Sequence, residues 1–197
     1  MTPLYLDTTT IITRMANESL EERQHEFIIS NESGDDYETA FKIEGWDLSQ
    51  RMKGKKKVTY GHPSQNDKDP DVIIGKGDER IEGRNLMSIL TIEPESMGNR
   101  IANAVHEKLL FGSLTDASIR AYISDGRPGD ESLGEDPKLF YYTRQKLVDW
   151  GVVPDGSNPD TMKTRESITA FIKSHTPVSR HRDLEILRVL ATRYYIM

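Results

Sequence analysis

Between residues 25 and 153 the chain is a succession of short segments rich in β-branched and aromatic residues, separated by polar loops. Segments of this kind, bounded by Gly, Pro, Asn and Asp, are typical of β-strands. They are His25–Ser30, Thr39–Trp46, Lys57–Gly61, Val72–Gly77, Asn85–Glu93, Leu114–Tyr122, Phe140–Gln145 and Lys146–Val153. The pattern predicts an α+β fold built on an antiparallel sheet or β-barrel of about seven strands.

Helical patterns occur at two places outside these segments. An apolar residue recurs at every fourth position from Met97 to Leu109, which forms one stripe on a helix. Ser96 is the expected N-cap and Gly112 the expected C-terminal stop. Beyond a Pro- and Gly-rich breaker, Thr161–Ser174 and Arg180–Tyr195 are predicted to be helical.

These changes of pattern divide the chain into three parts. We expect an N-terminal arm over residues 1–24, a main domain over residues 25–160 and a helical C-terminal tail over residues 161–197. The formal net charge of −6 argues against a surface that binds duplex nucleic acid. The dense basic run Arg51–Lys57 is predicted to be a solvated loop.

The composition of the chain argues against cysteine-based chemistry, membrane spans and a bound cofactor. The absence of cysteine rules out disulfides, thiolate metal sites and cysteine nucleophiles. No apolar stretch approaches the ~20 residues that cross a bilayer, and no signal peptide is apparent, so we expect an intracellular protein without membrane contact. No metal or other cofactor is implied, because His25, His106, His175 and His181 lack partners at metal-ligand spacing.

Two of the strand-like segments carry a reactive side chain. Val58–His62 ends in a histidine as the chain enters a polar loop, and Leu114–Tyr122 holds Ser118 in its middle. Alternation along the second segment places Ser118 and Arg120 on a polar face, opposite an apolar face that includes Ala117. A neutral histidine can take the proton of a serine hydroxyl and make it a nucleophile. If the two strands are neighbours, His62 and Ser118 form the centre of a serine hydrolase.

Asp149 is the candidate third member of this set. It lies within the otherwise apolar strand segment Lys146–Val153, where a carboxylate needs a hydrogen-bonding partner. A histidine N–H can be that partner, and Asp149 would then orient His62. Arg120, two residues from Ser118, is a candidate for contact with substrate or with a developing oxyanion. Glu93 or Glu95 could replace Asp149 as the acid, although both also suit the start of the following helix.

In their order along the chain, several stretches resemble the tailed-bacteriophage prohead (capsid maturation) serine proteases, which are related to the herpesvirus assemblins. The resemblance covers residues 38 to 160. The stretches are Phe41–Ser49, Val58–His62, Ile73–Gly77, Phe111–Leu114, Ala117–Ile119, Lys146–Pro154 and Asn158–Pro159. Three positions depart from the family pattern: Lys55-Lys56 stands where Asn-Pro is usual, Arg120 where glycine is frequent, and Asp149 where glutamate is usual.

The resemblance implies a herpesvirus-protease-like antiparallel β-barrel with flanking helices. By match it implies His62 as general base, Ser118 as nucleophile and Asp149 as the orienting acid. The expected substrates and partners are the phage scaffold and major capsid proteins, with self-cleavage of the tail, inside the prohead in the host cytoplasm; self-association is left open. Two alternatives share the same hydrophobic pattern: an inactive scaffolding protein with this fold, and a β-barrel module that only binds peptides.

Overall fold

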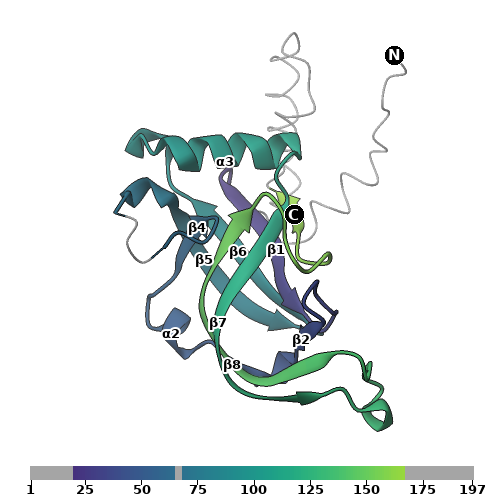
Figure 1. Ribbon diagram of the computed structural model, residues 1–197. Helices are drawn as coiled ribbons and strands as arrows, with labels where there is room; N and C mark the ends of the chain where they lie inside the picture. Colours follow the sequence, from purple (N-terminus) through teal and green to yellow (C-terminus); the bar gives the residue numbers. More distant parts are fainter. Residues whose placement is uncertain (1–19, 65–67, 167–197) are drawn as a thin grey trace, which may run out of the picture.

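The predicted strands pair into one mixed sheet, with a helix across one end, in a computed structural model that describes residues 20–64 and 68–166 (Figure 1). The strands of this part are β1 (Gln24–Asn31), β2 (Thr39–Phe41), β3 (Trp46–Asp47), β4 (Lys57–Tyr60), β5 (Ile73–Glu82), β6 (Asn85–Ile92), β7 (Asp116–Pro128), β8 (Phe140–Val153) and β9 (Lys163–Glu166). Its α-helices are α2 (Ser49–Met52) and α3 (Arg100–Phe111). The fold is therefore α+β, as the sequence predicts.

The long strand β8 is the centre of the pairing. β7 lies antiparallel along one edge of β8, whereas β2, β3 and β4 lie parallel to successive stretches of its other edge. The sheet then continues from β4 through β5, β6 and β1 to β9. The predicted antiparallel barrel is therefore wrong in two respects, because the sheet is mixed and does not close into a barrel.

Three predicted elements differ in extent from the observed ones. Phe140–Gln145 and Lys146–Val153 are one continuous strand, since neither Gly nor Pro interrupts the chain between them. The helix expected from Thr161 is not formed at Lys163–Glu166, which is strand β9 paired with β1. The rest of the predicted tail and most of the predicted arm lie outside the described residues.

A seam separates β7 from β1 and β9 at the other end of the sheet, and β7 would have to pair across it to close the sheet. Next to β9, Met162 forms an isolated bridge with Asp116 at the start of β7, and its carbonyl accepts a hydrogen bond from the Ile28 N–H of β1 at 3.0 Å. Beyond this point β7 has β8 as its strand partner in the described part of the chain. The outer edge of β7 is therefore covered at its start and left unpaired further along.

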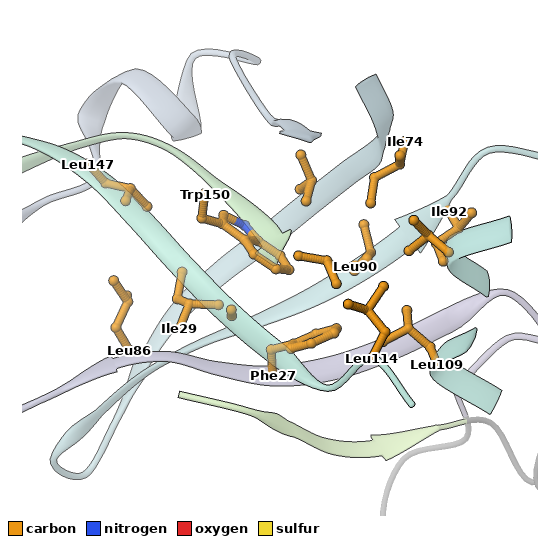
Figure 2. Close-up of a cluster of buried hydrophobic side chains, with 14 of the residues drawn as sticks. Phe27, Ile29, Ile74, Leu86, Leu90, Ile92, Leu109, Leu114, Leu147 and Trp150 are labelled. Atoms are coloured by element: carbon orange, nitrogen blue, oxygen red, sulfur yellow. The ribbon is translucent and has the colours of Figure 1, made fainter. Parts of the chain in front are cut away.

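The hydrophobic core lies on the inner face of the curved sheet, under α3 (Figure 2). Trp150 of β8 is fully buried, and its ring lies 5.3 Å from the ring of Phe27, between centroids. Ala117 belongs to this cluster, and Ile119 packs against it, which confirms the apolar face predicted for β7. Each large apolar side chain buried in this way contributes roughly 1.5–3 kcal/mol to folding.

Helix α3 covers one end of the core with its apolar stripe. Val105 and Leu109 are buried, as the four-residue spacing predicts, whereas Met97, the first residue of the predicted stripe, lies before the helix and is exposed. Gly112 ends the helix in the left-handed conformation. The N-cap is Asn99, whose side chain accepts the Ala102 N–H at 2.9 Å. The predicted N-cap Ser96 instead belongs to a short 3-10 turn, Glu95–Met97, before the helix.

Part of the basic run is buried, contrary to the prediction that it is solvated. The Arg51 guanidinium of α2 is 1% exposed and donates to Glu79 of β5 at 2.5 Å and to the carbonyl oxygens of Lys55 and Lys57. Glu79 also accepts from the Trp150 indole N–H at 3.1 Å. This network anchors the loop before β4 to the sheet, because a buried guanidinium needs both a counter-charge and acceptors.

A buried histidine pair joins β1 to α3. His25 Nε2 and His106 Nδ1 lie 3.0 Å apart, and both residues are buried. Burial, followed by the charges of His106, Lys163 and Arg23, lowers the pKa of His25 to about 3. The folded protein therefore holds His25 neutral at pH values where the unfolded chain, with a pKa near 6.5, takes up a proton.

This difference predicts that acid destabilises the protein through His25. Between the unfolded pKa near 6.5 and the folded value, the free energy of unfolding should fall by about 1.4 kcal/mol per pH unit from this group. In urea unfolding at pH 7 and pH 5, the wild type should lose about 2 kcal/mol more than His25→Gln does. An equal loss in the two proteins would contradict this prediction.

Candidate active site

The strands that carry the two predicted catalytic residues flank β8 on opposite sides. Ser118 of β7 lies opposite Gly151 of β8, and Gly151 in turn lies beside Thr59 of β4. His62 follows β4 by two residues. The structure therefore brings the His62 and Ser118 segments to the same level of the sheet, separated by one strand.

The chain crosses over β8 immediately after β4. The Gly61 N–H still bonds to the Val152 carbonyl at 2.8 Å, whereas the Pro63 carbonyl accepts a long 3.5 Å hydrogen bond from Arg120 Nη1 of β7. His62 is the residue between these two anchor points. It is thus carried from the β4 side of β8 towards the β7 side, where Ser118 lies.

Gly151 allows this crossing. A Cβ atom at this position would come within 2.4 Å of the Gly61 carbonyl oxygen, far inside van der Waals contact. Gly61 itself has a φ of 69°, and its carbonyl accepts the Thr59 hydroxyl at 2.7 Å. A glycine inside a strand often marks close approach of another backbone, and Gly151 is the sequence signal for this crossing.

A β-bulge at Val148 separates Leu147 from Asp149 in β8. In the register of β7 with β8, Arg120 pairs with Asp149 and Ala121 pairs with Leu147, so Val148 is skipped. Uninterrupted alternation along β8 would place Leu147 and Asp149 on one face. The bulge instead sends Leu147 into the core, whereas Asp149 alternates regularly with the buried Trp150 and stays on the face that carries Arg120.

The Asp149 carboxylate is fully buried and bound by cations. Arg120 Nε donates to Oδ1 at 3.1 Å and Arg120 Nη2 to Oδ2 at 2.6 Å, while Lys57 Nζ lies 3.4 Å from Oδ2. Among the described residues no hydrogen bond joins Asp149 to His62. The predicted orienting contact is therefore not formed here, and Arg120, the predicted substrate contact, is occupied by the ion pair.

The protonation of His62 is influenced by this ion pair. Partial burial of the ring lowers the pKa of His62, the Asp149 charge raises it, and the Arg120 charge lowers it, with a net downward shift. The imidazole is consequently neutral at pH 7 and able to accept a proton. Neutral imidazole is the state that a general base requires.

A groove of about 460 Å³ contains both candidate catalytic residues. It lies at the seam between β1 and β7, and Ile29, Tyr142 and Asn158 line it together with His62 and Ser118. The residues beyond His62 and Ser118 come from segments far apart in the chain. No local motif marks them, which is why the sequence did not identify the groove.

The outer edge of β7 in this groove has an unpaired stretch of backbone. The Ala117 N–H donates to the Thr161 carbonyl at 3.2 Å, so the backbone groups of Ala117 point away from β8. In an antiparallel pair the direction alternates, and those of Ile119 therefore also point away from β8. In the described part of the chain no strand pairs with them on that side.

The other candidate groups take structural positions. Glu93, considered as an alternative acid, accepts from the Asn99 side chain at 2.7 Å next to the start of α3. His106, predicted to be structural, contacts His25, and no pattern in the sequence pairs these two residues. Among the described residues no cluster of three or more His, Asp or Glu side chains could hold a metal ion.

The helices in that part of the chain are too short or too polar to span a membrane.

Comparison of the chain with protein-family models, with curated proteins and with solved structures found no match.

Crowding at Gly151 gives a test of the crossing. Gly151→Ala should lower the free energy of unfolding by about 1–3 kcal/mol, because the new methyl group displaces the Gly61 carbonyl or bends β8. Urea unfolding measures this change. Gly156→Ala is the control, since the nearest heavy atom to its added Cβ is 3.2 Å away; equal effects at the two positions would contradict the close crossing.

Proposed function

We propose that this protein is a serine endopeptidase in which His62 is the general base and Ser118 the nucleophile. One observation carries the proposal: two side chains from strands on opposite sides of β8 line the same groove, because the chain after β4 crosses over Gly151. Both residues line one groove, and a neutral histidine that can reach a serine hydroxyl is the pairing that acyl transfer needs.

The reaction follows from these positions. Ser118 Oγ attacks the carbonyl carbon of a peptide bond while His62 accepts the hydroxyl proton. The tetrahedral intermediate collapses, the C–N bond breaks, and the leaving amine takes that proton from His62. Water, activated by His62, then hydrolyses the acyl-enzyme and frees Ser118. Asp149 remains the proposed third member, since its buried negative charge stabilises the imidazolium that forms.

The Ile119 N–H is the group best placed to stabilise the oxyanion. It follows the nucleophile directly, and it belongs to the backbone that points away from β8 into the seam. Backbone donors directed at a developing oxyanion contribute several kcal/mol in acyl-transfer enzymes. The same unpaired edge of β7 suits an extended substrate chain, which can pair with it as an added strand.

The substrates are proposed from the resemblance to prohead proteases. Residues 38–160 carry the stretches of that resemblance in family order, and His62, Ser118 and Asp149 occupy the matching positions. We therefore propose that the substrates are scaffold and capsid-protein extensions, cleaved inside an immature phage shell in the host cytoplasm. The groove would equally serve a module that binds extended peptides without cutting them, and the experiment below separates the two.

Co-expression with the matching scaffold and capsid proteins tests the proposal. The wild type should shorten its partners or itself on a gel, and the shortened bands should disappear with Ser118→Ala and with His62→Ala. Loss of the nucleophile leaves at most the small residual catalysis that binding alone provides.

Ser113→Ala is the matched control, because Ser113 is an exposed serine in the turn just before β7. It should cleave like the wild type. Co-purification of intact partners with no cleavage by the wild type would instead support the binding module, and identical bands in the wild type and Ser118→Ala would contradict the enzyme.

A further inference from the structure

We propose that Arg120 is a positioning residue: its ion pair with Asp149 fixes the guanidinium, which then holds the Pro63 carbonyl and with it the His62 loop across β8. This inference rests on the proposed function, and it replaces the predicted contact of Arg120 with substrate. It also gives Asp149 a role that does not need a direct hydrogen bond to the imidazole.

The hydrogen bonds of the guanidinium support this role. Two of its nitrogen atoms, Nε and Nη2, bind the two oxygens of Asp149 in the bidentate arrangement that arginine favours. The third, Nη1, is directed at the Pro63 carbonyl, 3.5 Å away. One planar group thus connects β8, β7 and the loop after β4.

Burial of Asp149 fixes the position of the Arg120–Asp149 ion pair. The carboxylate is fully buried, whereas the Arg120 side chain is 37% exposed, so the aspartate is the fixed member of the pair. Lys57 of β4 binds the same carboxylate from the other side. Among the described residues, the charges that act on His62 are those of Asp149 from β8 and Arg120 from β7, with Lys57 of β4 bound to Asp149, while Asp35 and Asp155 line the same groove.

On either side of His62, the described residues attach the loop at two places. The Gly61 N–H holds it to the β4 side of β8, and the hydroxyl of Thr59 holds the Gly61 carbonyl. Towards β7, the contact given by the described residues is that of Arg120 with Pro63. Loss of the guanidinium would free the His62 side of the loop while leaving the β4 side attached.

Arg127 provides a matched control on the same strand. It also makes a bidentate pair, with Glu135, and its side chain is also 37% exposed. It lies in the distal part of the β7–β8 hairpin, at the opposite end of β7 from Ser118 (Figure 1). Arg127→Gln therefore removes an equivalent ion pair without touching the His62 loop.

The test is the titration of the His62 imidazole by NMR in the full chain, which needs no substrate. Arg120→Gln should raise the pKa of His62, because a lowering charge is lost and the freed ring becomes more solvated. Asp149→Asn should lower the pKa of His62, because the charge that raises it is lost. Arg127→Gln should leave it unchanged. Shifts in the same direction for the first two variants, or no shift with Arg120→Gln, would overturn the proposal.

Arg120→Lys supplies the kinetic test, since it keeps the charge near Asp149 but cannot bind Asp149 and Pro63 in one plane. Its kcat should fall roughly 10- to 100-fold with KM nearly unchanged, as expected for a misplaced base. Wild-type kinetics for this variant would overturn the positioning role. Absence of cleavage by the wild type would contradict the proposed enzyme instead. The His62 titration in Arg120→Lys, which keeps the charge, would then decide whether Arg120 holds the loop: the pKa of His62 should still rise as the ring becomes more solvated, and an unchanged pKa would overturn the positioning role.

Discussion

The buried carboxylate of Asp149 is the constraint from which the arrangement of this site follows. A charge removed from water is tolerated only with a counter-charge and hydrogen bonds close by, and loss of one partner of such a pair typically costs 3–5 kcal/mol. Arg120 and Lys57 meet that requirement from the strands on either side of β8. Because Arg120 also reaches Pro63, the group that neutralises Asp149 fixes the loop that contains His62.

Strand β8 gives these contacts their geometry. It pairs with β7 along one edge and with β2, β3 and β4 along the other, so residues distant in the sequence meet across it. Its Asp149 pairs with Arg120 of β7, and Gly151, two residues later, lets the backbone of Gly61 pass over the strand. Within a few residues, one strand therefore holds the buried charge, the crossing point and the partner of Ser118.

The elements that depend on local patterns could be predicted from the sequence. The apolar stripe of α3, its stop at Gly112 and the two faces of β7 follow from helical and strand periodicity, and all three are observed. The pairing order could not be predicted, because β2, β3 and β4 join β8 across long stretches of chain, and no turn encodes such parallel pairs. The antiparallel barrel was the simpler expectation from a series of strands, and the structure differs from it for this reason.

For the candidate site, the residues could be predicted from the sequence but their contacts could not. His62, Ser118 and Asp149 could be chosen by residue type and strand position, and the structure brings all three segments together around β8. The partner of Asp149 could not be deduced, since the register that places Arg120 of β7 opposite it is not encoded in either strand alone. The buried state of Arg51 was missed for a related reason: a basic run looks solvated until the distant Glu79 is known to lie beside it.

The central claim is that His62 activates Ser118 as a nucleophile. Covalent labelling by an organophosphorus fluoride, followed by mass spectrometry of the digested chain, measures this directly, because such reagents phosphorylate serines that a neighbouring base activates. The account predicts an adduct on the peptide containing Ser118 in the wild type and its loss in His62→Ala. An unmodified Ser118, or equal modification with and without His62, would contradict it.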